Sequence, residues 1–497
     1  PRISIVSISS SCWRGETSAR KRPLVRKSCY YTRSLTLREN SAMREVAEAG
    51  LTPLERRTTF GLAGVYGVRM LGLFMILPVF ALYANHLEGV TPGLVGLAIG
   101  IYGLTQALFQ IPLGMMSDRV GRKPVIVGGL LVFAVGSVVA AMSESITGII
   151  IGRALQGSGA VAAATLALAA DLTRETVRAR VMATIGLTIG LAFTVAMVLG
   201  PLLDQWVGVP GIFWLTALLA LLAVAIVALV VPTPVNTKTH RDTRLMGDYL
   251  KPVLADGQLL RLDFGIFALH MLMTANFVVL PLQFTEVFHI EQTAHWKIYL
   301  PVMLGGFVAM LPLIIIGEGK RKMKQVFSLA VGILLLAELL LMIDPGGVVG
   351  LIAGLFAFFV AFNFLEASLP SLVAKLSPAD AKGTAMGIYS TSQFMGIFVG
   401  GAAGGLIHQY MGMKGVFLFG ALVALVWLLL ALTMKQPQYT TTFVMPVAVH
   451  SPAESQSLVD RLTAVAGVAE ATVIASEGMA YLKVDKKQLD HEALAAF

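Results

Sequence analysis

Cysteine is almost absent from this sequence. Its 497 residues include only Cys12 and Cys29, and both precede residue 30. The rest of the chain therefore cannot form a disulfide or a thiolate metal site. No cluster of His, Cys and Asp has metal-ligand spacing, and no glycine-rich loop ends in Gly-Lys-Ser or Gly-Lys-Thr. These absences leave no basis for an enzyme, a bound cofactor, a metal site or ATP-driven transport.

Charged residues are also scarce. Only 13% of the residues are charged and 56% are apolar, whereas a soluble domain has about 25% charged residues. The net charge of +9 would suit a nucleic-acid partner, but the basic residues lie mostly in short loops between apolar runs. Basic loops of this kind are typical of membrane topology, so we expect a lipid bilayer and no nucleic acid as partner.

Apolar runs of about 20 residues recur from Phe60 onward, and each is long enough to cross a bilayer. The sequence predicts about twelve spans in two sets of six. They lie near 61–84, 93–116, 124–142, 146–170, 180–203, 211–231, 262–285, 297–316, 326–343, 348–373, 383–407 and 414–434. The predicted fold is thus an all-α membrane bundle with halves at 43–231 and 261–436 and a cytoplasmic linker at 232–260.

The loops on one side of these spans carry most of the basic residues, including Arg122, Lys123 and Arg178. The loops on the other side carry only Lys297 and Lys414. Because positively charged loops stay in the cytoplasm, we expect the first side to be cytoplasmic. An even number of spans then places both termini in the cytoplasm.

Residues 1–42 differ from the bundle because they are basic, rich in serine and without the apolar region of a signal peptide. We leave this extension unexplained and expect it to be disordered. Two alternatives are open for it. Met43 can be the natural start of the chain, or the extension can have a targeting role.

Residues 437–497 also differ from the bundle in their sequence pattern. They begin with alternating apolar and polar residues, which predicts a strand, and continue with a predicted helix over 452–465. A hairpin is predicted across 477–478, and a last helix from about residue 487 to the end. This β-α-β-β-α order predicts a small α+β ferredoxin-like domain in the cytoplasm, truncated before its last strand. It contains no Cys-x-x-Cys pair, so we reject a copper chaperone.

The loop between the second and third predicted spans is Gly114-Met115-Met116-Ser117-Asp118-Arg119-Val120-Gly121-Arg122-Lys123. Gly114 permits close helix contact, and Gly121 permits a turn with positive φ. Asp118 ends its helix at the membrane surface, where it can face the positive N-terminus of another helix. Arg122 can reach Asp171, and Arg178 can extend that pair into a network. The alternative, above all for Arg119 and Lys123, is that these charges only set topology.

Polar residues inside the predicted spans are candidates for lining a solute cavity. They are Arg69, Gln106, Gln110, Arg153, Gln156, Asn276, Asn363, Glu366 and Gln393, to which Glu338 and His270 are added. Gln106 and Gln110 share one helix face, as do Asn363 and Glu366. Glu366 is the candidate proton carrier, because a carboxylate inside a membrane is a functional hypothesis by default.

Each of these residues also has a structural alternative. Glu366 and His270 can form hydrogen bonds to a neighbouring helix, and Arg153 can extend its side chain to the outer surface. Asp204 and Asp263 lie at span ends, where we expect them to be solvated. In the fifth span Gly186, Gly190, Gly200 and Pro201 are expected to allow close helix packing and a kink.

Three of these patterns resemble motifs of the major facilitator superfamily of transporters. The Gly114–Lys123 loop resembles the signature between its second and third helices, and residues 152–159 resemble its fourth-helix R-x-x-Q-G motif. Gly200-Pro201 resembles the fifth-helix motif that is common in exporters. A weaker copy of the first loop, with Glu318 in place of Asp118, lies in the second half. Runs at 99–107, 320–327 and 382–387 resemble one bacterial inner-membrane subgroup.

The resemblance implies a monomeric, proton-driven exporter of an unidentified small molecule, built as a twelve-helix bundle. It implies that Asp118 meets the N-terminus of the eleventh span near Lys382 and Gly383. With Arg122 and Asp171 this would form an inner latch that holds an outward-facing state. Two other functions stay open: a membrane sensor that signals through its C-terminal domain, and proton-coupled nutrient uptake.

Overall fold

A computed structural model describes residues 50–233, 250–343, 347–378, 381–436, 441–447, 452–474, 478–485, 488–494 and 497. The predictions made for residues 1–42 and for most of the linker lie outside these residues. Within them, ten helical segments are long and apolar enough to cross a membrane. We name the helices before Val231 the first half and those from Gly257 to Leu432 the second half.

The first half consists of seven α-helices and two short turns of other helix types. They are α2 (Pro53–Phe74), α3 (Leu77–Tyr83), η1 (Ala84–His86), α4 (Pro92–Val120), α5 (Arg122–Ala141), α6 (Ile146–Ser158), α7 (Ala162–Asp171), α8 (Glu175–Ala225) and η2 (Ile226–Val230). Helix α2 begins with a capping box, in which Thr52 and Glu55 each accept from the other's backbone N–H. Helix α4 ends at Gly121, whose φ of 107° confirms the predicted turn.

The second half repeats this pattern. It consists of α10 (Gly257–Leu282), η3 (Gln283–Val287), η4 (Gln292–Ala294), α11 (His295–Ile314), η5 (Ile315–Gly319), α12 (Met323–Ile343), α13 (Val348–Leu376) and α14 (Lys382–Leu432). Helix α10 begins before the predicted span at 262, because the Asp256 carboxylate accepts from the backbone N–H of Gln258 at 2.7 Å and so caps the helix.

Two helices, α8 and α14, have 51 residues each, and each contains a non-helical glycine. Gly208 has φ of 64° and Gly412 has φ of 70°, in the left-handed region that favours glycine. A straight helix of this length would span about 76 Å, more than twice the roughly 30 Å of a bilayer core. The glycine therefore divides each helix where two spans are predicted.

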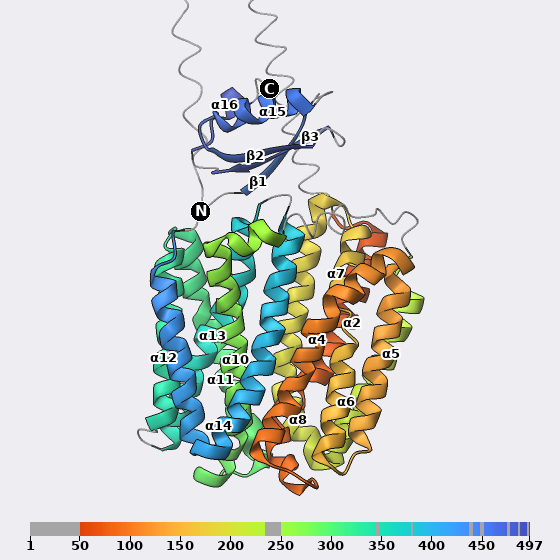
Figure 1. The fold of residues 1–497 in the computed structure, drawn as a ribbon, viewed down its shortest axis with the longest axis vertical. Helices are drawn as coiled ribbons and strands as arrows, with labels where there is room; N and C mark the ends of the chain where they lie inside the picture. The colour runs from red at the N-terminus through yellow and green to blue at the C-terminus, as the bar shows by residue number, and fades with distance from the viewer. Residues whose placement is uncertain are drawn as a thin grey trace, which may run out of the picture.

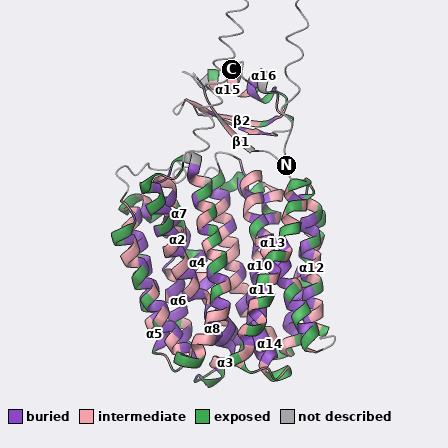
Figure 2. Ribbon diagram, turned by 180° about the vertical axis from the view of Figure 1, so that it is seen from behind, coloured by how far each residue is buried: buried purple, intermediate pink, exposed green. Residues whose placement is uncertain are grey.

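The outer surface of the bundle is apolar. Figure 2 shows exposed residues on the outward faces of the helices and buried residues between them. Large apolar side chains such as Leu187, Leu218, Leu229 and Val349 are exposed there. A soluble protein rarely leaves so much contiguous apolar surface in water, whereas lipid accommodates it.

The small C-terminal domain lies at one end of the bundle, which we name the domain end (Figure 1). It contains β1 (Thr441–Pro446), α15 (Pro452–Thr463), β2 (Val468–Ile474), β3 (Met479–Val484) and α16 (His491–Leu494). The sheet is antiparallel with the order β1-β3-β2. The last helix begins later than predicted, because the Asp490 carboxylate accepts from the backbone N–H of Ala493 and caps it.

The two halves meet closely at the end opposite the domain end. A Cβ atom at Gly96 of α4 would lie only 2.2 Å from the carbonyl oxygen of Gly401 in α14, so the two backbones touch. Nearby, Gln292 donates to Asp204 at 2.5 Å. The described residues form no hydrogen bond or ion pair between the halves closer to the domain end than Gln110 and Thr391. The halves are thus joined at the opposite end and separate toward the domain end.

Candidate functional site

The Gly114–Lys123 loop holds a buried ion pair at the domain end. Arg122 begins α5 and is buried; its guanidinium pairs with Asp118 and donates to Asp171 at 3.1 Å and to the Ser117 hydroxyl at 2.7 Å. The predicted pairing of Arg122 with Asp171 is therefore present. It fastens α4 and α5 to α7 within the first half.

The other residues of the predicted network lie around this pair. Gly114 approaches α7, with Ala163 at 3.4 Å from the position of an added Cβ. Arg178 donates to the carbonyl oxygen of Ala170, next to Asp171, at 3.3 Å. Arg119 is exposed and Lys123 is half-buried.

The predicted partners in the second half are not joined to this pair. Lys382 and Gly383, at the start of α14, are exposed. Asp118 has its described ion pair with Arg122 of its own half. The contact of Asp118 with α14 stays a prediction for a state in which the domain end is shut.

A second ion pair lies beside the first. Arg174 donates to both carboxylate oxygens of Glu55 at 2.8 Å, which fastens the start of α8 to the start of α2. Donating these hydrogen bonds to Glu55 raises the pKa of the Arg174 guanidinium. The pair therefore stays ionised at any physiological pH.

Two arginines lie in the interior of the first half. Arg69 donates to the Tyr102 hydroxyl and to Gln106, both at 2.7 Å. Arg153 donates to Gln156 at 2.9 Å and to two backbone carbonyls of α4, so its side chain does not extend to the outer surface. These contacts hold α2, α4 and α6 together.

Glu366 of α13 lies in the second half with 38% of its side chain exposed between the helices. It lies 3.8 Å from His270 and accepts from Gln393 at 3.4 Å. Gln393 also lies 2.9 Å from His270 Nε2. Asn363, one helical turn away, is half-buried too. The structure thus brings together three predicted cavity residues from α10, α13 and α14.

Asn276 and Glu338 lie deeper in the same half. Asn276 donates to Glu338 at 2.8 Å, and both side chains are buried. For Asn276 and Glu338 the structure therefore shows a hydrogen bond between neighbouring helices instead of side chains that line a solute cavity. Glu366 also accepts a hydrogen bond from a neighbouring helix, through Gln393 of α14, but 38% of its side chain is exposed, whereas Asn276 and Glu338 are buried.

The prediction that Asp263 is solvated was wrong. Its side chain is only 6% exposed and lines a cavity of about 340 Å³ between α10 and α14. The span-end argument failed because α10 begins before the predicted span, which places Asp263 inside the bundle. Asp263 and His270 are seven residues, or about two helical turns, apart and therefore share one face of α10. That spacing was the sequence signal that Asp263 belongs with the cavity residues. Asp204 is half-buried and accepts from Gln292.

The packing predicted for two glycines of the fifth span was also wrong. Gly186 and Gly190 are exposed, and a Cβ atom at either would have no neighbour within 4 Å. They lie on the same exposed side of α8 as Leu187 and contact no neighbouring helix. Gly200 does pack closely, because an added Cβ would lie 2.4 Å from the Met75 carbonyl oxygen. The break in α8 is at Gly208, not at Pro201.

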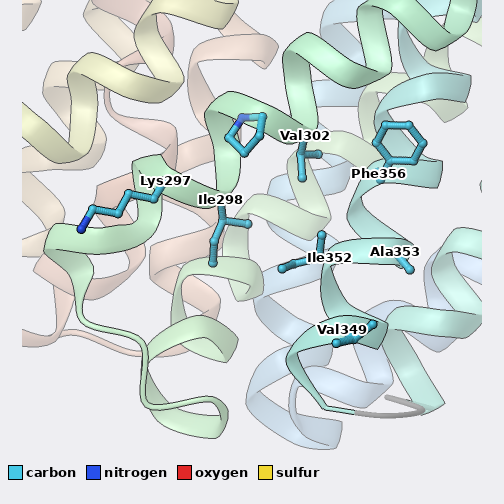
Figure 3. A pocket seen from close by; sticks show the side chains of 8 residues that line it. Lys297, Ile298, Val302, Val349, Ile352, Ala353 and Phe356 are labelled. Atoms are coloured by element: carbon cyan, nitrogen blue, oxygen red, sulfur yellow. The ribbon is translucent and has the colours of Figure 1, made fainter.

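A larger cavity, of about 430 Å³, lies between α11 and α13 (Figure 3). Its lining is apolar apart from Lys297, and Pro301, Ile352 and Phe356 are exposed on the outer surface. It contains no acid, amide or hydroxyl to select a solute. Among the described residues no group of three His, Cys, Asp or Glu residues has metal-site geometry. The polar groups around Glu366 and Asp263 are therefore the candidate solute site.

Comparison with known proteins agrees with these motifs. The Major Facilitator Superfamily matches residues 62–400 and 324–466. The chain is 49% identical to the inner membrane transport protein YajR of Escherichia coli (strain K12), over 88% of this chain and 96% of the relative. It is 26% identical to the multidrug resistance protein MdtH of Aeromonas hydrophila subsp. hydrophila, over 70% and 86%.

Solved structures share the fold at low identity. The D-xylose-proton symporter superposes with a TM-score of 0.63 at 14% identity, covering 77% of this chain and 99% of the symporter. Members of the matched family are transporters and not enzymes. The chain is therefore a multi-pass membrane protein that belongs to the Major Facilitator Superfamily.

Proposed function

We propose that the protein exports a small organic solute in exchange for protons, by alternating access between its halves. The observation that carries this proposal is Glu366, an acid inside the bundle whose side chain is 38% exposed and whose carboxylate contacts His270 and Gln393. A carboxylate in this setting can bind and release a proton as its surroundings change between two conformations.

The contacts between the halves support the alternating-access part of the proposal. The halves touch through backbone at Gly96 and Gly401 and separate toward the domain end. With the basic loops at the domain end placed in the cytoplasm of a bacterial inner membrane, this is an inward-facing state. Helices α8 and α14 then cross the membrane twice each, which makes twelve crossings.

The ion pair at the domain end supports a latch. Asp118, Arg122 and Asp171 already form one buried cluster in the first half. When the domain end shuts, Asp118 meets the positive N-terminus of α14 near Lys382 and Gly383 and holds the outward-facing state. Protonation of an acid in this cluster would weaken the latch and favour inward opening.

Relatives support export and proton coupling only by analogy. The name of MdtH states multidrug resistance, and the D-xylose-proton symporter is named for proton coupling. A second candidate function, sensing through the C-terminal domain, is favoured by the two hydrogen bonds that join Asp485 to Arg321. The strand order of that domain supports a ferredoxin-like unit.

Purified protein in vesicles loaded with a pH-sensitive dye tests the proposal. Addition of a transported solute should change the internal pH in the wild type and not in Glu366→Gln, because the amide cannot carry the proton. Glu286→Gln, an exposed acid at the opposite end, is the matched control and should behave like the wild type. Solute-dependent pH changes of equal size in Glu366→Gln and wild type would exclude Glu366 as the carrier. Their absence for every solute of a broad library would favour the sensor.

A further inference from the structure

Asp263 is a buried carboxylate for which the structure shows no partner. Only 6% of the residue is exposed, and no described residue forms a hydrogen bond or ion pair with its carboxylate. Carboxylates whose residue is this deeply buried are usually paired, because their desolvation costs roughly several kcal/mol. The oxygens of Asp263 are not fully enclosed by protein and reach the cavity that the residue lines. An unpaired acid that faces a cavity indicates that its partner is a ligand.

The cavity in front of Asp263 has a distinct chemical lining. Its walls carry two aromatic rings, a thioether and two hydroxyls beside the acid, from Asp263, Phe264, Phe267, Thr391, Ser392 and Met395. The rings of Phe264 and Phe267 lie 6.2 Å apart. No lysine or arginine lines the cavity, so the acid has no competing cation.

The cavity faces the space between the halves and not the lipid. Along α10 the accessible residues Leu260, Phe264 and Phe267 follow one helix face, and every residue from Ala268 to Leu282 is buried. A lipid-facing stripe would continue to the end of the helix. On the other wall Thr391 accepts from Gln110 of the first half at 2.8 Å. The cavity therefore opens where the halves separate, toward the domain end.

We propose that this cavity binds an organic monocation with an apolar, aromatic-sized body, and that Asp263 is its counter-charge. The inference rests on the transport function proposed above, for which it names the substrate class. Phenyl rings attract a cation through their faces, and methionine sulfur packs well against aromatic groups. An anion would be repelled by Asp263, and a sugar would find too few hydrogen-bonding groups on walls that are mostly apolar.

The depth of the two acids gives Asp263 a role different from that of Glu366. His270, which touches Glu366, lies two turns further along α10 than Asp263, or about 10 Å deeper. Asp263 therefore meets a solute near the domain end, and Glu366 lies on the path beyond it. The cation binds first and the proton carrier stays free for its own exchange.

Equilibrium dialysis against tetraphenylphosphonium tests the site, with tetraphenylborate as an anion of the same shape. The protein is the full chain in nanodiscs of zwitterionic lipid, with empty nanodiscs subtracted. Wild type should bind the phosphonium and not the borate. Asp263→Asn should bind the phosphonium at least about tenfold more weakly, whereas Asp263→Glu and the exposed-acid control Glu286→Gln should stay within about threefold of wild type.

Two results would overturn the proposal: equal binding of the phosphonium by wild type and Asp263→Asn, or equal binding of the two ions by wild type. The comparison of the phosphonium with the borate uses only the wild-type protein, so it tests the proposal even if Asp263→Asn does not fold. Phosphonium binding that depends on Asp263, in a protein that moves no protons in vesicles, would retain this site and reject the proposed transport. Normal proton-coupled transport without phosphonium binding would reject this site and retain the proposed transport.

Discussion

At the scale of single residues, burial distinguishes two ion pairs near the domain end, one in each half. In the first half Arg122 and Asp171 are both almost fully buried. In the second half Lys375 and Glu318 lie 2.6 Å apart, but 26% and 38% of their side chains are exposed. An exposed pair contributes about 0–1 kcal/mol, whereas leaving one member of a buried pair without its partner costs about 3–5 kcal/mol.

This contrast predicts different effects when the acid of each pair is replaced by its amide. Asp171→Asn should lower stability by about 1–3 kcal/mol, less than for an isolated pair because Asp118 still neutralises Arg122. Glu318→Gln should change it by about 0–1 kcal/mol. Thermal denaturation of the two detergent-solubilised variants measures both, and equal shifts in melting temperature would contradict the assignment of burial as the cause.

At the scale of helices, the contact between α4 and α14 depends on glycine. A Cβ atom at position 96 would meet the Gly401 carbonyl oxygen at 2.2 Å and the Gly405 backbone at 2.6 Å. Backbone atoms cannot turn aside as a side chain can, so the helices must separate. Gly96→Ala should therefore disfavour the state with the opposite end shut, and favour the state in which it opens.

Spin labels at Gln205 and Thr293, one in each half, report this opening as a longer distance. The two native cysteines are first replaced by serine. Gly128→Ala is the matched control, since an added Cβ there has no neighbour within 4 Å. A penalty of about 1–3 kcal/mol should shift the ratio of the two states by about fivefold or more. Identical distance distributions in both variants would show that the contact does not set the equilibrium.

The helices of the bundle could be predicted from the sequence because lipid requires runs of about 20 apolar residues. The turn at Gly121 and the pairing of Arg122 with Asp171 followed from local spacing and charge. The positions that could not be predicted depend on which helices pack together in the folded bundle. Gly186 is exposed because no helix packs against that side of α8, and Asp263 faces a cavity between α10 and α14. The sequence of a single span does not show which other helices pack against it.

At the scale of the whole molecule, the C-terminal domain is attached to the second half. Arg321, in the loop before α12, donates to both carboxylate oxygens of Asp485 at 2.8 and 2.6 Å. Lys483 of β3 donates to the carbonyl oxygen of Ser377, just after α13, at 2.8 Å. The described residues show no such bond from this domain to the first half. The domain should therefore move with the second half when the halves rock.

This attachment predicts that Arg321→Asp releases the domain and that the double variant Arg321→Asp with Asp485→Arg restores it. The pair is partly exposed, with 31% and 19% of the two side chains accessible, so its loss should cost about 1 kcal/mol and raise the undocked fraction about fivefold. Spin labels at Gln325 of α12 and Thr463 of α15 measure this release. The distance distribution should be broad in Arg321→Asp and narrow again in the double variant.

A control substitution, Lys320→Gln in the same loop, should leave the distribution narrow, because Lys320 has no described bond to the domain. A domain that stays docked in Arg321→Asp would mean that Lys483 and Ser377 suffice. A double variant that stays undocked would mean that opposite charges at positions 321 and 485 are not sufficient to dock the domain, and that the geometry of the two hydrogen bonds from the Arg321 guanidinium is required.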